Sequence, residues 1–153
     1  MCALNPKHPA NRAVLASLKA SASQKGKKLG PFAPPESVDD PGMNCGSHPD
    51  VVDHVWGPLA RAVPDGVRCL IYGTPALFDP NSGVILAVCY GTAYCIRVPA
   101  GAQVPKKRIV REWMDGETTD LAMEFGPHWI FGDFGPGEPQ ALREVSAEFA
   151  AAE

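Results

Sequence analysis

Long hydrophobic runs are missing from this sequence of 153 residues. No apolar stretch approaches the roughly 20 residues that a membrane-spanning helix needs. The opening stretch, MCALNPKHPANR, also lacks the charged segment and apolar core of a secretory signal. We therefore expect a cytoplasmic protein that has no membrane partner.

A strong excess of charge is also missing. The chain has 14 Lys and Arg against 17 Asp and Glu, for a net charge of -3. The small basic cluster Lys106-Lys107-Arg108 falls short of the basic surface that tracks phosphates along a nucleic acid. We expect no nucleic-acid partner.

The common catalytic and cofactor motifs are absent too. There is no GxxxxGK[ST], GxGxxG, GxSxG or HExxH. The five cysteines form no CxxC pair, and Cys69, Cys89 and Cys95 each fall within an apolar run, where a thiol acts as a small buried hydrophobe. The sequence therefore predicts no cofactor, no metal site and reduced cysteines.

Residues that interrupt regular secondary structure are frequent, with 15 Gly and 16 Pro, and this composition favours short strands joined by many turns. Three runs rich in β-branched and aromatic residues predict strands at Val67–Tyr72, Val84–Tyr90 and Ala93–Val98. The uncharged run Val84–Tyr90 is expected to lie at the centre of the sheet. The proline-containing segment 73–83 is predicted to connect the first two strands, and Trp129–Phe131 to form a further short strand.

Helices are predicted on both sides of these strands. The segment Ser47–Val63 begins with capping residues and repeats apolar residues at helical spacing, with a kink or a split expected at Gly57-Pro58. Glu138–Ala152 is the clearest amphipathic helix. Asn11–Ala22 predicts a weaker helix, because its apolar stripe is narrow.

Together these elements predict an α+β fold. Residues 45–153 would form a single domain, with an antiparallel sheet of four to five strands packed by two main helices. Residues 1–44 would form an N-terminal arm with one weak helix and a Pro-rich linker. This arm would be either a loosely attached leader or a segment that lies across the domain or a partner.

One group of residues suggests catalysis. A thiol at Cys45, just before a predicted helix, would feel the positive end of the helix dipole, which lowers its pKa. His48 or His54 could then act as a base, oriented by Asp50 or Asp53. The alternative is that both histidines are ordinary residues of a helix start and a helix surface.

The same residues allow a zinc hypothesis. Cys45, His48 and His54 are possible ligands, with a fourth from Cys69 or Asp53. Structural zinc sites usually show two ligand pairs, whereas this stretch has one loose CxxH and no second pair. This hypothesis therefore stays an alternative.

The most aromatic stretch runs from Phe125 to Phe134. Trp129, Phe131 and Phe134 are candidates for a partner-binding surface, and the alternative is core packing beside glycine turns. We expect a small protein-binding domain without catalytic activity, of immunity-like or adaptor-like size and charge. It would contact its partner through the sheet face or this aromatic loop. The alternative is a cysteine-dependent or zinc-assisted hydrolase or transferase centred on Cys45, His48 and His54.

Overall fold

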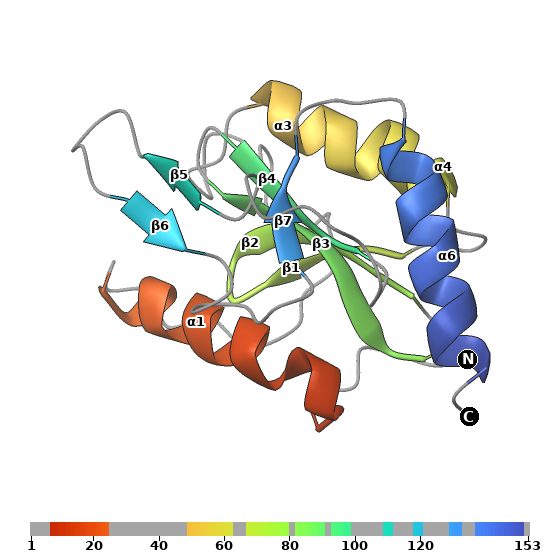
Figure 1. The fold of residues 1–153 in the computed structure, drawn as a ribbon. Coiled ribbons are helices and arrows are strands. Elements are labelled where there is room, and N and C mark those ends of the chain that lie inside the picture. Colours follow the sequence, from red (N-terminus) through yellow and green to blue (C-terminus); the bar gives the residue numbers. More distant parts are fainter. Residues whose placement is uncertain are drawn as a thin grey trace.

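The structure is a computed structural model (Figure 1). It describes residues 7–24, 49–62, 67–79, 82–90, 93–98, 109–111, 118–120, 129–132 and 137–151. A five-stranded antiparallel sheet with packed helices confirms the predicted α+β fold class.

The main sheet has the strand order β1-β2-β3-β4-β7, and every neighbouring pair is antiparallel. Its strands are β1 (Val67–Ile71), β2 (Thr74–Asp79), β3 (Val84–Tyr90), β4 (Ala93–Arg97) and β7 (Trp129–Phe131). Two further strands, β5 (Ile109–Arg111) and β6 (Thr118–Asp120), form a separate two-stranded sheet.

The central position predicted for Val84–Tyr90 is confirmed, because β3 has two strands on each side and residues 84–89 are buried. Strand β2 was not predicted, since Pro75 lies inside it. The proline is tolerated because it pairs with Leu70 of β1 and stands one residue before the β2–β3 pairing begins at Ala76. No β3 carbonyl in this register therefore needs the N–H that Pro75 lacks.

The turn between β1 and β2 consists of two residues with positive φ. Tyr72 has φ 48° and Gly73 has φ 82°. This combination is the type I′ geometry, whose twist matches that of the strands it joins. Tyr72 therefore adopts a conformation that glycine or asparagine usually occupies.

The helix before the sheet is interrupted where the sequence predicted. It consists of α3 (Pro49–His54), a π-helical segment η3 (Val55–Leu59) and α4 (Ala60–Ala62). Pro58 lies inside the π segment, whose wider turns accommodate a residue that has no N–H to donate. The Trp56 Nε1–H of this segment donates to the Ala76 carbonyl of β2 at 2.9 Å, which fixes the helix on the sheet.

Two further helices complete the fold. A short 3₁₀ turn η1 (Pro9–Asn11) leads into α1 (Arg12–Gln24), and α6 (Glu138–Ala151) follows the sheet, close to the predicted helix bounds. In the part of the chain that the structure describes, no helix is long and apolar enough to cross a bilayer.

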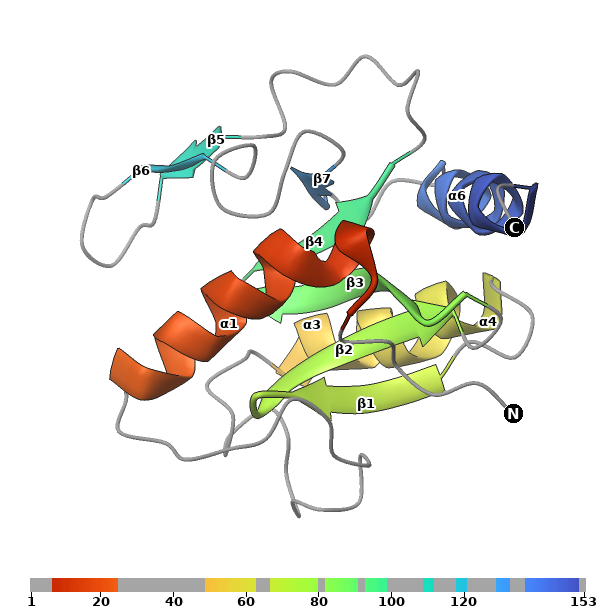
Figure 2. The ribbon, with the colours of Figure 1, turned by 90° about the horizontal axis from the view of Figure 1, so that it is seen from below.

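Helices cover both faces of the main sheet, as Figure 2 shows for α1, which lies across β3 and β4. Residues of α3, η3, α4 and α6 share one apolar cluster with one face of the sheet, including Leu77, Ala87 and Ile96. The opposite face packs against Val14, Leu15 and Leu18 of α1. The narrow apolar stripe of α1 is therefore part of the core, and residues 45–48 at the predicted domain start lie outside the described residues.

Candidate functional site

The predicted catalytic residues are only partly described. Cys45 and His48 lie outside the described residues, so the structure does not place them relative to His54. His54 ends α3, with a side chain 17% exposed, while Asp50 and Asp53 are exposed.

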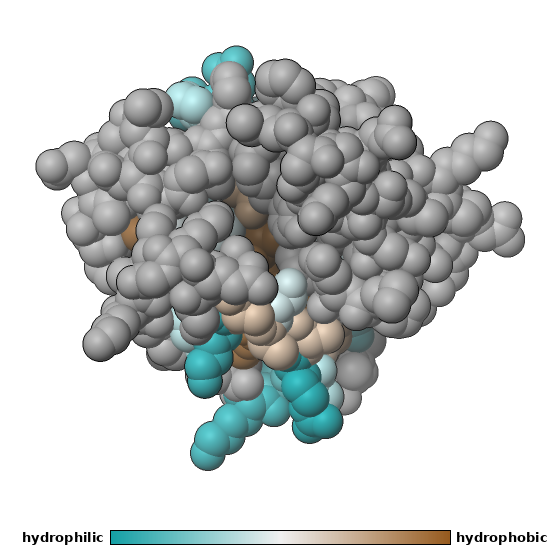
Figure 3. Space-filling model, turned by 90° about the vertical axis from the view of Figure 1, so that its left-hand side faces the viewer, coloured by the Kyte–Doolittle hydropathy of each residue, from teal (hydrophilic) through white to brown (hydrophobic). Residues whose placement is uncertain are grey.

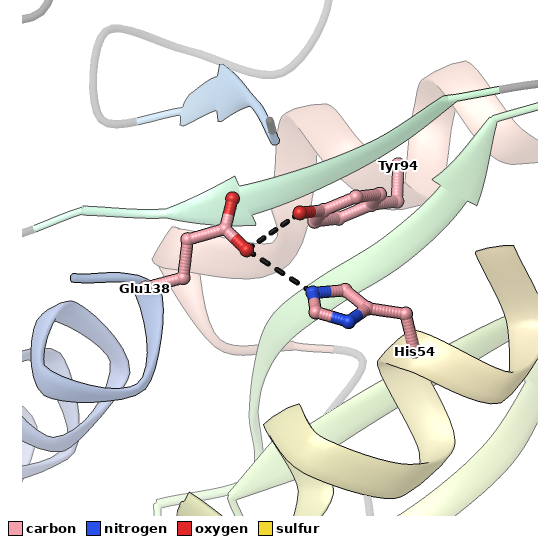
Figure 4. A network of polar contacts seen from close by, with 3 residues as sticks. All are labelled: His54, Tyr94 and Glu138. Atoms are coloured by element: carbon pink, nitrogen blue, oxygen red, sulfur yellow. Dashed lines mark hydrogen bonds and ion pairs between the residues drawn. The ribbon is translucent and has the colours of Figure 1, made fainter. Parts of the chain in front are cut away.

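His54 contacts a carboxylate from a distant segment (Figure 4). Its Nε2 lies 3.1 Å from Oε1 of Glu138, and the Tyr94 hydroxyl donates to the same oxygen at 2.5 Å. The His54 and Tyr94 rings also contact each other, with centroids 4.9 Å apart. We call His54, Tyr94 and Glu138 the Glu138 network, in which α3, β4 and α6 meet.

The position of Glu138 follows from its place in the helix. It is the first residue of α6, where unpaired N–H groups and the helix dipole favour a carboxylate. Its side chain is only 7% exposed, so the Tyr94 and His54 contacts replace water at this carboxylate.

Tyr94 depends on a glycine that packs against its ring. The Tyr94 side chain is buried, and a Cβ added at Gly132 would lie 1.9 Å from the Tyr94 Cε2 atom. The Gly132 amide also donates to the Tyr94 carbonyl at 2.8 Å. Only glycine at position 132 leaves room for the ring that reaches Glu138.

The Glu138 network fixes the orientation of one imidazole. When the neutral His54 ring carries its proton on Nε2, it donates to Glu138, and Nδ1 becomes the basic nitrogen. A carboxylate that orients a histidine in this way is a recurrent part of nucleophilic and acid–base sites. The same contacts also join α6 to α3, which is a structural role.

A second polar cluster is centred on Arg97, whose side chain lies on the face of the sheet opposite the Glu138 network. Asn11 is fully buried, accepts from the Ile85 amide and donates to the Gly83 carbonyl, each at 2.9 Å. Arg97 donates from Nε to the Ile85 carbonyl at 2.9 Å. We call Asn11, Arg97, Trp129 and Phe149 the Arg97 cluster, because the guanidinium also contacts both aromatic rings.

The three described cysteines are buried free thiols. Burial raises the pKa of Cys69 to about 12, so this thiol stays protonated and unreactive at neutral pH. Cys69 packs in the apolar cluster under α1, whereas His54 contacts Tyr94 in the cluster on the other face. The two side chains are separated by the sheet, so Cys69 cannot complete a zinc site with His54. Over the described ranges, no three His, Cys, Asp or Glu residues are grouped as a metal site requires.

The predicted aromatic surface is described only at Trp129. Its side chain is fully buried in the cluster beneath α1, so its ring offers no exposed area to a partner. The side chain of Phe131 and the whole of Phe134 lie outside the described residues. Helices also cover both faces of the sheet, which removes the described sheet face as a binding surface.

Sequence reasoning missed the residues that define both clusters. Glu138 was visible only as a helix start, Tyr94 and Arg97 only as strand residues, and Asn11 only as part of a weak helix. The one available signal was a polar residue at an end of a predicted apolar element, as at Asn11 and Arg97. Glu138 lies 44 residues from Tyr94 and 84 residues from His54 along the chain, so local patterns do not connect these partners.

Comparison of the chain with known protein families, curated proteins and solved structures gives no relative from which a function follows. No family model matches the chain, and neither a curated protein nor a solved structure shows significant similarity to it.

Proposed function

We propose that this protein is a small binding domain without catalytic activity whose partner is another protein. The observation that carries the proposal is the outer face of α1, which combines exposed cations with exposed alanines. Arg12 and Lys19 are exposed there, alongside exposed Ala13, Ala16 and Ala20. No acidic residue occurs between Arg12 and Gln24.

The α1 face is locally basic on a chain whose net charge is -3. In Figure 3, hydrophilic side chains project beside paler residues at the bottom of the view, where α1 lies, while strongly hydrophobic residues are visible only in recesses. Electrostatic complementarity therefore favours an acidic protein segment as the partner. The two cations Arg12 and Lys19 are too few to track a polyanion such as a nucleic acid.

The internal chemistry is consistent with a binding role. The described thiols are buried, and His54 is held by Glu138 rather than presented at an open surface. Free thiols in a core are typical of a reducing compartment, and we propose the cytoplasm as the site of binding.

Affinity capture with paired variants tests this function. The wild type and the exposed α6 variant Arg143→Glu should capture the same protein, which is then identified, purified and titrated. The double variant Arg12→Glu/Lys19→Glu should weaken the measured Kd at least about tenfold, because it reverses the charge of the α1 face. Binding that is unchanged in the double variant would place the interface elsewhere. A turnover activity lost in Cys45→Ala would overturn the non-catalytic proposal.

A second candidate function is cysteine-dependent catalysis, and the contact between His54 and Glu138 favours it. A thiolate at Cys45 would use a histidine base that a carboxylate already orients, although Glu138 replaces the Asp50 or Asp53 expected from the sequence. Rapid alkylation of Cys45 at pH 6, slowed in His54→Asn, would support this function. Reactivity typical of a thiol with a pKa near 8.5 would exclude it. Elemental analysis of the purified protein tests the alternative hypothesis that zinc assists this catalysis.

A further inference from the structure

Arg97 is a buried cation at the end of β4. Only 5% of the residue is exposed, and it lies on the face of the sheet that α1 covers. Nε donates to the Ile85 carbonyl at 2.9 Å, and Nη2 donates to the Ala10 carbonyl at 3.0 Å. The central guanidinium carbon is 4.8 Å from the centre of the Trp129 ring and 5.7 Å from that of Phe149.

The charge of Arg97 has no counter-ion among the described residues. Its contacts are neutral carbonyls and aromatic rings, and no described carboxylate lies within ion-pair distance. Burial lowers its pKa to about 10, which reflects the cost of removing this cation from water. Buried charges in proteins are normally paired or bound to a ligand.

The guanidinium also has donors left over. Arginine carries five N–H donors, and the two described bonds use Nε and one hydrogen of Nη2. The remaining three donors, both of Nη1 and one of Nη2, bond to no described residue. The Nη1–Nη2 edge of a guanidinium matches the two oxygens of a carboxylate.

Some of the residues that surround Arg97 are partly exposed. Phe149, which contacts it from α6, is half-buried, and so are His8 and Ala10 beside it. The His8 and Phe149 rings meet edge to face, with centroids 5.7 Å apart. His8 Nδ1 accepts from the Ala10 amide at 3.0 Å, so Nε2 of its neutral ring is a further N–H donor.

We propose that Arg97 anchors a binding site for a carboxylate group, which would enter beside His8 and Phe149 at the junction of η1 and α6. The carboxylate would accept from the Nη1–Nη2 edge and supply the negative charge that the described core lacks. A flat group fits the two rings and the planar guanidinium better than a tetrahedral phosphate. Arg97 lies on the opposite face of the sheet from the Glu138 network, whereas Phe149 of α6 also packs against the apolar cluster that contains Tyr94. The site is independent of the protein partner proposed above.

Titration of the wild-type protein with acetate, malonate and phosphate, each against chloride at equal ionic strength, tests the proposal. Two-dimensional NMR reads the Nε–H resonance of Arg97 and the indole N–H of Trp129. We expect saturable shifts of both with acetate or malonate and weaker shifts with phosphate. Shifts that merely follow the chloride control would overturn the site. Phosphate binding as tight as that of the carboxylates would overturn the ligand class.

Variants locate the site. Arg97→Met should weaken carboxylate binding at least about tenfold, as loss of charge-assisted hydrogen bonds predicts, and Arg97→Lys should weaken it nearly as much because a lysine lacks the planar fork. The exposed Arg61→Met on α4 should bind as the wild type does. Equal weakening in Arg61→Met would show diffuse electrostatics instead of a site at Arg97. If the Arg97 variants fail to fold, the wild-type resonances still decide the question.

Discussion

The two faces of the sheet each hold one polar cluster, and the clusters stabilise charge in different ways. In the Glu138 network, a buried carboxylate accepts from Tyr94 and contacts His54. In the Arg97 cluster, a buried cation is surrounded by neutral carbonyls and aromatic rings. The Asn11 side chain in this cluster donates to the Gly83 carbonyl and accepts from the Ile85 amide. The first cluster joins one helix to another, whereas the second joins η1 to the backbone of the sheet.

This difference predicts in which cluster the loss of a side chain lowers the stability of the fold most. Removal of the Tyr94 hydroxyl or the His54 ring leaves the Glu138 carboxylate with its other partner. Removal of Asn11 leaves two backbone groups of the sheet without their partner, and a buried unsatisfied group costs more than a hydrogen bond contributes. The Arg97 cluster should therefore be the less tolerant of the two.

The largest effect is expected for Asn11→Ala. It leaves the Ile85 amide and the Gly83 carbonyl without their side-chain partner, at about 1–3 kcal/mol each, so the free energy of unfolding should fall by roughly 4 kcal/mol. Urea unfolding measures this change. Ser17→Ala, a half-buried change on the same helix, should stay within about 0.5 kcal/mol. A loss smaller than that of Tyr94→Phe would reverse the comparison between the clusters.

Gly132→Ala should come next. The new methyl group would overlap the Tyr94 ring and force it away from Glu138, with an expected loss of about 3 kcal/mol. The matched control is Gly137→Ala, because a Cβ added there meets nothing within 4 Å. Similar unfolding free energies for the two variants would contradict the close packing of Gly132 on Tyr94.

Tyr94→Phe isolates a single hydrogen bond of the Glu138 network. Loss of a bond to a charged acceptor should lower the unfolding free energy by about 2 kcal/mol, measured by urea denaturation. Tyr72→Phe, at a half-buried turn residue, provides the comparison for removing a phenol oxygen. No difference between the two variants would mean that the Tyr94 bond to Glu138 contributes no net stability.

The smallest expected change, about 1.4 kcal/mol for one pH unit, concerns the pH dependence of stability on the face under α1. The pKa of Cys69 rises from 9.0 to about 12 on folding, because burial disfavours the thiolate. Its contribution to stability is complete below pH 9 and is lost as the pH rises toward 12, because the unfolded chain then releases a proton that the folded chain keeps. The difference in unfolding free energy between wild type and Cys69→Ala should shrink by roughly 1.4 kcal/mol per pH unit in this window. A difference that stays constant from pH 8 to 11 would show that Cys69 is not shielded from water.

Local sequence patterns predicted the elements better than their contacts. The uncharged run Val84–Tyr90 predicted a central strand, and the amphipathic pattern of Glu138–Ala152 predicted a helix, and the structure confirms both. Strand β2 was missed because Pro75 opposes strand formation locally, and only the register with its neighbours shows that its missing N–H is harmless.

The candidate site was predictable in one residue of three. His54 was identified as a possible base, but its carboxylate was sought among Asp50 and Asp53, which are exposed. The carboxylate it contacts belongs to Glu138, 84 residues away. That contact depends on the packing of α6 beside α3, which no local pattern contains.

Helix α6 supplies a residue to each cluster, Glu138 to one and Phe149 to the other. During translation, the strands and the first helices are therefore made before either cluster can close. A nascent chain that stops short of α6 would expose the part of the apolar sheet face that α6 covers and would leave both polar clusters incomplete, which are features that promote aggregation. Productive folding should thus be timed by the emergence of α6 from the ribosome.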